Sequence, residues 1–314
     1  MTTIVDPPAH ARPSTVTRRD IARAGATRVA RDSRVKIWIG SICALAVILP
    51  VACAQLLPLP SPDATDLAQR RLPPLTPGHL FGTDQLGRDL LSRVLYGGQV
   101  SLTVGILAVV VSGLIGLCLG ALAGYLGGWA DTVVSRLLEA QLSLPLLMML
   151  LLVVALFGPS IPVITFVIAI AQWPEIARLT RSLVLVEREK PYIAASRVLG
   201  LGRTAILLRH IVPNIIKQAS LVVLLLLAQA VLLESALSYL GAGPQRPFAT
   251  WGRIISDGQD YITTSWWLVT LPGLVIVLLV VGVNLLGDGL RDRPKSLRLQ
   301  PGVLQRLRAW KGIA

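Results

Sequence analysis

Apolar and polar stretches alternate along this chain of 314 residues with a spacing that fits a lipid bilayer. A helix rises about 1.5 Å per residue, so about 20 apolar residues cross the hydrocarbon core. The fourth apolar run is the weakest, because residues 172–175 are Gln-Trp-Pro-Glu, and it is predicted to bend at the proline or to face protein more than lipid. Six spans are predicted, at residues 37–57, 99–124, 138–158, 161–178, 215–240 and 266–287.

The composition supports an all-α, polytopic membrane protein. The chain is 53% hydrophobic and 15% charged, which is more apolar surface than a soluble protein of this length can bury. The net charge of +13 could indicate nucleic acid binding, but Lys and Arg are grouped beside the apolar runs, as membrane topology requires. The expected surroundings are therefore membrane lipid, with no nucleic acid. Cys43, Cys53 and Cys118 lie in apolar runs and predict neither a disulfide nor a zinc site.

The basic residues also predict the orientation. Residues 12–36 and 178–217 contain eight Lys and Arg each, and residues 291–311 contain seven, whereas residues 58–98 and 241–265 are balanced in charge. Because positive loops stay on the inner side, both termini are predicted to be cytoplasmic.

This orientation gives a division of the chain into three parts. The predicted parts are a flexible basic cytoplasmic tail at 1–36, a six-span domain at 37–290 with an outer loop at 58–98 and an inner loop at 179–214, and a cytoplasmic tail at 291–314.

Three acidic residues in or beside the spans are candidates for function, since a lone charge in a bilayer is costly. Glu139 follows Arg136 by three residues, and Glu175 precedes Arg178 by three, so both are interpreted as helix ion pairs. Glu234 has no neighbouring cation. It is the best candidate for lining a polar pathway, with a structural role as the open alternative.

Four glycines recur at every fourth residue of the second span. Gly116, Gly120, Gly124 and Gly128 would share one helix face, where small residues permit close contact with a neighbouring helix. Packing is the preferred interpretation, and a role in lining a substrate passage is the alternative.

The outer loop contains two acid–base pairs spaced by four residues, Asp84 with Arg88 and Asp89 with Arg93. This spacing predicts a short amphipathic helix along the outer membrane surface. No metal site is expected, because His10, His79 and His210 are scattered. The chain also contains no phosphate-binding loop and no nucleophile elbow, so it is predicted not to be an enzyme.

The inner loop is more ordered in pattern than a simple connection. Pro191 is suited to start a helix, and Gly200 and Gly202 to end it. The resulting short helix is predicted to dock on another protein through one face. The residues on that face are Tyr192, Ala195, Ser196 and Leu199.

The same segment resembles a known motif. Residues 192–200, Tyr-Ile-Ala-Ala-Ser-Arg-Val-Leu-Gly, followed by Ile-Val-Pro at 211–213, resemble the EAA loop of bacterial ABC importer permeases. FGTDQLGRDLLSRVLYG at 81–97, SYLGAG at 238–243 and NLLGDGLRD at 284–292 resemble the dipeptide, oligopeptide and nickel permeases, specifically their second, C-type subunit. The resemblance implies the type I ABC importer permease fold.

It further implies a coupling helix that docks on a cytoplasmic ATPase. The partners implied are a second permease subunit in a heterodimer, two cytoplasmic ABC ATPases that carry ATP and Mg, and an extracytoplasmic substrate-binding protein. This chain would bind no cofactor itself and would lie in the bacterial inner membrane. The residues assigned to ATPase coupling are Pro191, Tyr192, Ile193, Ala194, Ala195, Ser196, Arg197, Leu199, Gly200, Gly202 and Pro213.

One departure from the motif is Ala194, which stands where the family has Glu. Docking would then depend on shape and on Arg197, Arg203 and Arg209, although these arginines could equally hold the loop at the anionic inner leaflet.

The predicted function is a permease subunit that forms half of a peptide pathway, with cavity-facing residues from the second, third and fifth spans. The alternatives are the same machinery importing nickel or another small solute, an ion-gradient-driven secondary transporter, and, least favoured, an intramembrane enzyme.

Overall fold

The computed structural model describes residues 18–245 and 247–292, with side chains from residue 32 onward. These residues form helices and no strand, which confirms the all-α prediction. The α-helices are α1 (Arg18–Ala52), α2 (Leu90–Leu126), α3 (Gly128–Leu142), α4 (Leu146–Phe157), α5 (Ile161–Arg188), α6 (Pro191–Val198), α7 (Arg203–Ile206), α8 (Val212–Tyr239), α9 (Trp251–Gly258) and α10 (Trp267–Arg291). Short 3₁₀ helices are η1 (Ala54–Leu56), η2 (Leu67–Gln69) and η4 (Gln259–Tyr261), and η3 (Leu207–Ile211) is a π-helical turn.

The described residues contain five helices long and apolar enough to cross a membrane, and a sixth if α3 and α4 count as one broken span. The axes of α3 and α4 differ by 89°, so the prediction of one helix at 138–158 is wrong. The break lies at residues 143–145, where Pro145 disfavours a helical conformation in the preceding residue. The remaining spans are Asp32–Ala52, Leu90–Leu126, Ile161–Arg188, Arg203–Tyr239 and Trp267–Arg291.

The first helix is longer than predicted. It starts at Arg18, so residues 18–36 of the tail predicted to be flexible are helical. The rest of that tail, and the C-terminal tail from residue 293, lie outside the described residues.

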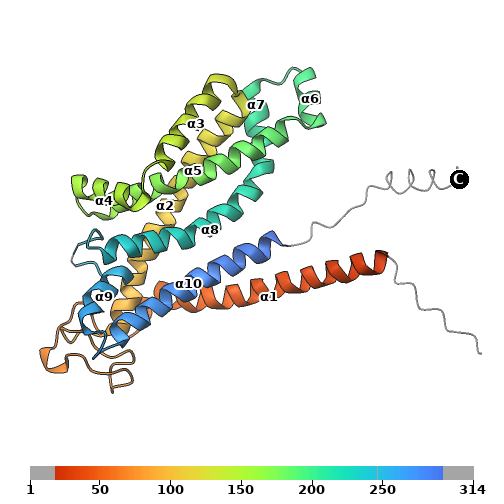
Figure 1. Cartoon of the computed structure of the whole chain (residues 1–314). Coiled ribbons are helices and arrows are strands. Elements are labelled where there is room, and N and C mark those ends of the chain that lie inside the picture. Colours follow the sequence, from red (N-terminus) through yellow and green to blue (C-terminus); the bar gives the residue numbers. More distant parts are fainter. Residues whose placement is uncertain (1–17, 246, 293–314) are drawn as a thin grey trace, which may run out of the picture.

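The helices form two packed groups joined by α8 (Figure 1). α1 and α10 run side by side, in contact at Gly40 and Gly282, where a Cβ atom would come within 2.6–2.7 Å of the facing backbone. α2 packs along α5, and α8 contacts α2, α5 and α10. The prediction that the fourth span faces protein is confirmed: 61% of the most apolar stretch of α5 is buried, against 22–39% in the other four spans.

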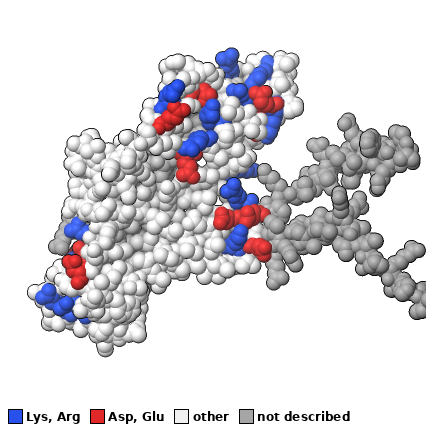
Figure 2. Space-filling view, viewed as in Figure 1, with Lys and Arg blue, Asp and Glu red and all other residues white. Residues whose placement is uncertain are grey.

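On the face of the molecule drawn in Figure 2, charged side chains are absent from the middle. Figure 2 shows them near α9 and the outer loop, over α3, α5 and α6, and at the ends of α1 and α10 farthest from α9, with an uncharged belt between. Such a belt fits a bilayer, which solvates apolar but not charged surface. The two sides of this belt are called the α9 end and the α6 end below.

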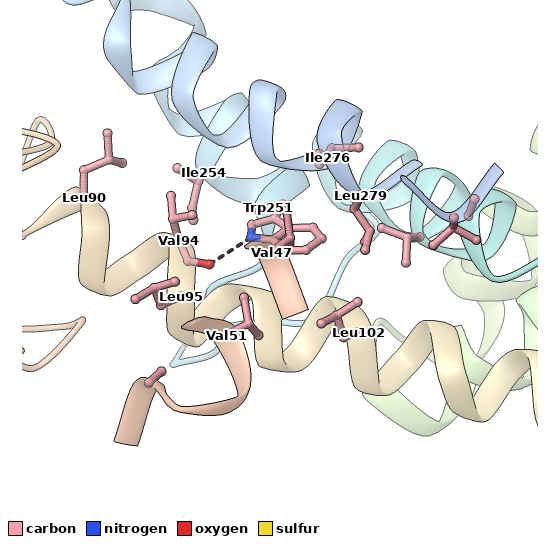
Figure 3. Close-up of a cluster of buried hydrophobic side chains, with 14 of the residues drawn as sticks. Val47, Val51, Leu90, Val94, Leu95, Leu102, Trp251, Ile254, Ile276 and Leu279 are labelled. Carbon is pink, nitrogen blue, oxygen red and sulfur yellow. Dashed lines mark hydrogen bonds between the residues drawn. The ribbon is translucent and has the colours of Figure 1, made fainter. Parts of the chain in front are cut away.

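A buried aromatic anchor organises the α9 end. Trp251 is fully buried among apolar side chains of α1, α2, α9 and α10, and its indole Nε1 donates a hydrogen bond to the carbonyl oxygen of Val94 at 2.8 Å (Figure 3). Burial of the ring and satisfaction of its only donor fix α9 against α2.

The short amphipathic helix predicted around residues 84–93 does not form. Asp84 instead accepts the backbone N–H groups of Leu86 and Arg88, a local bond pattern that competes with a helix. α2 then begins at Leu90, capped by the Asp89 carboxylate.

The expected charge pairs in this loop form only in part. Asp84 accepts from Arg88 Nε at 2.7 Å, as predicted, and also from Arg93 Nη1 at 2.6 Å. Asp89 contacts His79 at 2.8 Å rather than Arg93, whose second partner is Asp257 of α9 at 3.2 Å. The outer loop is therefore tied to α9 by buried charges and does not lie free along a surface.

Candidate functional site

The predicted docking helix exists as α6, the short helix at the far tip of the α6 end (Figure 1). It starts at Pro191, whose missing N–H would be unpaired at this position in any case. It ends in a left-handed residue, Gly200, with φ of +78°. The N–H of Gly200 binds the carbonyl oxygen of Arg197, and the N–H of Leu201 binds that of Ser196, which is the Schellman arrangement. Glycine is needed here for backbone conformation, since no atom would contact its Cβ within 4 Å.

Apolar burial holds α6 on the rest of the chain. Ile193 is fully buried and is the anchor of the helix. It belongs to a cluster with Ala121, Val184, Ile206, Leu207, Ile211 and Ile215. The cluster thereby joins α6 to α2, α5 and the start of α8.

A polar network reinforces the same joint. The Tyr192 hydroxyl donates to Glu187 at the end of α5 and accepts from Asn214 Nδ2 at 2.9 Å, while Lys190 Nζ donates to Glu187 at 2.6 Å. Burial and the hydrogen bond to Glu187 raise the pKa of the Tyr192 phenol above its ordinary value. The phenol therefore stays protonated and can hold both partners.

The exposed face of α6 agrees with the predicted one except at one residue. Tyr192, Ala195 and Leu199 are exposed, as predicted. Ser196 is buried, and its hydroxyl donates to the carbonyl oxygen of Tyr192, so its assignment to the docking face is wrong. Leu199 is 79% exposed, and the neighbouring Val198, which was not assigned to this face, is 88% exposed. Helical spacing alone does not show which face of α6 is covered. Burial of Ile193 turns Ser196, three residues later, toward the rest of the chain.

The other assigned residues surround this tip. Pro191, Ala194, Ala195 and Arg197 are exposed on α6, Gly202 caps α7, and Pro213 lies in the first turn of α8. Arg197 and Arg203 line a polar cavity of about 350 Å³ beside α6, whereas Arg209 is exposed on the π-helical turn and does not line it. Two cationic side chains, Arg197 and Arg203, thus lie beside the exposed apolar residues at the tip of α6.

Three of the four recurring glycines pack as predicted. A Cβ at Gly116, Gly120 or Gly124 would come within 2.4–2.8 Å of α5 atoms, so these glycines allow α2 and α5 to touch. The assignment of Gly128 is wrong: α2 ends at Leu126, Gly128 begins α3 with φ of +51°, and no atom lies within 4 Å of its Cβ position.

Of the two ion pairs predicted from the sequence, one forms and the other does not. Arg136 and Glu139 are paired at 3.0 Å on exposed α3, as predicted. Glu175 and Arg178 form no ion pair with each other or with any other described residue, so that interpretation is wrong. Both line a cavity of about 740 Å³ instead.

This cavity lies between α3, α4, α5 and α8, the third, fourth and fifth spans. The second span, predicted to face a cavity with the third and fifth, contributes no residue to it, because α5 covers the glycine face of α2.

A polar clamp in the wall of this cavity was not predicted. Pro174 has no N–H, so the carbonyl oxygen of Ile170 lacks its helical partner. Gln141 of α3 donates its amide to that carbonyl and accepts from Trp173 Nε1 at 2.7 Å. The proline in an apolar run was the available signal, but the partner 29 residues away in sequence is decided by packing.

Glu234 is fully buried in α8 at the α9 end, and it lines none of the cavities described here. One carboxyl oxygen accepts from Ser238 Oγ at 2.6 Å, and the hydroxyls of Ser101 and Thr250 lie beside the carboxyl. A role in a pathway stays a prediction. In this conformation Glu234 joins α2, α8 and the segment before α9.

A bundle of several apolar helices long enough to cross a membrane agrees with the comparisons with known proteins. Residues 116–294 match the family model of the binding-protein-dependent transport system inner membrane component. The chain belongs to this family. The resemblance inferred from residues 192–213 is therefore confirmed, and the chain is the permease subunit of an ABC importer rather than its ATPase.

Several relatives of this permease cover most of its length. It is 41% identical over 235 residues to the probable D,D-dipeptide transport system permease protein DdpC of Escherichia coli, covering 74% of this chain and 77% of the relative. It is 41% identical to the di/tripeptide transport system permease protein DppC of Pseudomonas aeruginosa over 68% of this chain and 70% of the relative. It is 40% identical to the oligopeptide transport system permease protein OppC of Haemophilus influenzae over 68% and 69%.

Proposed function

We propose that this permease forms one half of a translocation pathway for peptides, and that its α6 docks on a cytoplasmic ATPase. The relatives are named as permeases of dipeptide, di/tripeptide and oligopeptide transport systems, and these names support the class of solute. The observation that carries the coupling role is α6 itself, because it combines an exposed apolar tip with a rigid attachment to the spans.

The proposed assembly contains four other chains. A second, related permease completes the pathway as a heterodimer, two cytoplasmic ATPases bind ATP and Mg, and an extracytoplasmic binding protein delivers the solute. The α6 end then faces the cytoplasm of a bacterial inner membrane, with both termini on that side. The basic residues of 178–217 support this orientation.

The mechanism follows from the connections of α6. Movement of the docked ATPases displaces α6, and Ile193 together with the Tyr192–Glu187 contact passes the displacement to α2, α5 and α8. Because packed helices have discrete arrangements, such a displacement switches the bundle between two states rather than deforming it smoothly.

The test is to place a charge on the docking tip without disturbing the fold. In the complete transporter, Leu199→Asp should abolish ATP-dependent peptide uptake and ATPase attachment, since the side chain is exposed and has no packing role in the isolated subunit. Leu67→Asp is the matched control, an exposed leucine at the α9 end, and should leave both unchanged. Normal uptake by the Leu199 variant would overturn the coupling role.

The orientation can be measured separately. A single cysteine placed at position 199 in a chain without its three native cysteines should react with an impermeant maleimide only from the cytoplasmic side. Labelling of intact cells from outside would contradict the orientation.

A further inference from the structure

The cavity between α3, α5 and α8 contains polar side chains that nothing else in the described chain uses. Glu175 and Arg178 line it from α5, and Gln229 lines it from α8. None of the three makes a hydrogen bond or ion pair with a described residue. A carboxylate, a guanidinium and an amide are therefore available to a solute in a single cavity of about 740 Å³.

The other polar groups of the cavity wall are already occupied. Gln141 is committed to Ile170 and Trp173, and the Ser182 hydroxyl donates to the carbonyl oxygen of Leu179. The free groups are thus the two charged ones and one amide. Glu175 and Arg178 are exposed on the cavity wall, so two opposite charges are open to a ligand with complementary groups, and charged residues of a span that face such a cavity mark substrate paths.

The backbone that carries these charges is held independently of any ligand. Glu175 follows Pro174 directly, and the Gln141 clamp fixes α5 to α3 at the preceding turn. Rigid positioning of the charged groups lowers the ordering cost of binding. The proline would otherwise weaken the helix at this point.

The spacing of Glu175 and Arg178 fits a short molecule that carries one charged group at each end. Residues three apart on a helix place their Cβ atoms about 5–6 Å apart on adjacent turns. A two-residue peptide spans at most about 7 Å, at about 3.3–3.6 Å per residue. Its ammonium group could reach the carboxylate while its carboxylate meets the guanidinium, which pairs with carboxylates in two parallel hydrogen bonds.

We propose that Glu175 and Arg178 form a charge-reading subsite on the translocation path, which takes a solute with one cationic and one anionic end. This inference rests on the proposed function, under which the solute is a peptide with free termini. Glu175 binds the terminal ammonium and Arg178 binds the terminal carboxylate. Glu175 thus selects solutes with a free ammonium group, and Arg178 selects solutes with a free carboxylate, by non-covalent binding alone.

The experiment compares three probes in the assembled transporter with its binding protein. ATP-dependent uptake of dialanine, N-acetyl-dialanine and dialanine amide is measured in proteoliposomes at low concentration, and each rate is expressed as variant over wild type. The preference of the binding protein is the same in both preparations, so it divides out of this ratio.

Glu175→Gln should lower dialanine uptake about tenfold, as expected for loss of one charge-assisted hydrogen bond, and leave N-acetyl-dialanine within about twofold of wild type. Arg178→Gln should show the same selective loss with the amide as the unaffected probe. Glu175→Asp keeps the charge and should retain most of the preference.

Glu139→Gln is the matched control, because Glu139 is an acid on α3 that is paired with Arg136 and lines no part of the cavity. It should change no ratio. Equal loss of all three probes in Glu175→Gln would overturn the subsite and indicate a general defect, such as a broken pair with another subunit. Unchanged ratios would also overturn it.

The two proposals fail in different ways. If the unaltered transporter takes up none of the three probes with ATP, both the proposed function and the subsite are rejected. If the unaltered transporter works and only the variant ratios are flat, the proposed function stands and the subsite alone is rejected.

Discussion

The contact of Gly120 with α5 gives a quantitative test of the packing between the two helices. A Cβ at this position would lie 2.4 Å from the carbonyl oxygen of Ala177 and 2.8 Å from Thr180 Cβ. Real Cβ contacts are essentially never shorter than 3.0 Å, so Gly120→Ala must separate the backbones by at least 0.6 Å. The obstructing atom is backbone and cannot rotate away.

The matched control is Gly113→Ala on the same helix. Its Cβ would lie 3.7 Å from the nearest atom, an ordinary contact, so the methyl group fits without strain. Both substitutions gain about 0.5–1 kcal/mol from removing glycine from a helix, and that gain cancels when the two variants are compared. The remaining difference is the overpacking term of about 1–3 kcal/mol.

The assay is the free energy of unfolding in mixed micelles, followed by tryptophan fluorescence as SDS is added. Gly120→Ala should be less stable than Gly113→Ala by about 1–3 kcal/mol. Equal stability of the two variants would refute the reasoning, because it would mean that α2 and α5 separate freely or do not pack through this glycine.

The remaining predictions concern the tip, the outer loop and the clamp. Gly200→Ala should cost about 1–2 kcal/mol and impair ATP-dependent uptake, because its φ is +78°, whereas Gly202→Ala should be tolerated at φ of −66°. Asp84→Asn should lower the free energy of unfolding, measured by SDS titration, by about 3–5 kcal/mol, because Arg88 and Arg93 are buried and lose a charged partner. Glu139→Gln is the control at an exposed ion pair and should lower it by no more than about 1 kcal/mol. Gln141→Leu should cost about 1–3 kcal/mol for each polar group it leaves unpaired, measured in the same way, and no loss would contradict the clamp.

Some features of this permease follow from local sequence alone. Five of the six predicted spans and the short helix that starts at Pro191 were predictable, because bilayer thickness fixes the length of an apolar run and Pro191 and Gly200 constrain the backbone where they stand. Recognition of the family rested on the same short motifs, and residues 116–294 match its model.

Pairing between distant residues was not predictable in the same way. The sequence places Glu175 three residues from Arg178, which permits a bond, but in the structure both side chains line the cavity and form no ion pair with each other. Asp84 lies nine residues before Arg93 and 173 before Asp257, yet all three meet in one cluster.

One physical cause separates the features that the sequence predicts from those that it does not. Backbone conformation and apolar length are properties of a few consecutive residues, so the sequence alone determined most of the long helices, the two ends of α6 and the membrane class. Which face of a helix is covered depends on the neighbour that packs against it, so only the tertiary structure decided that Ile193 anchors α6, that Ser196 turns inward, and that no described residue packs on Gly128.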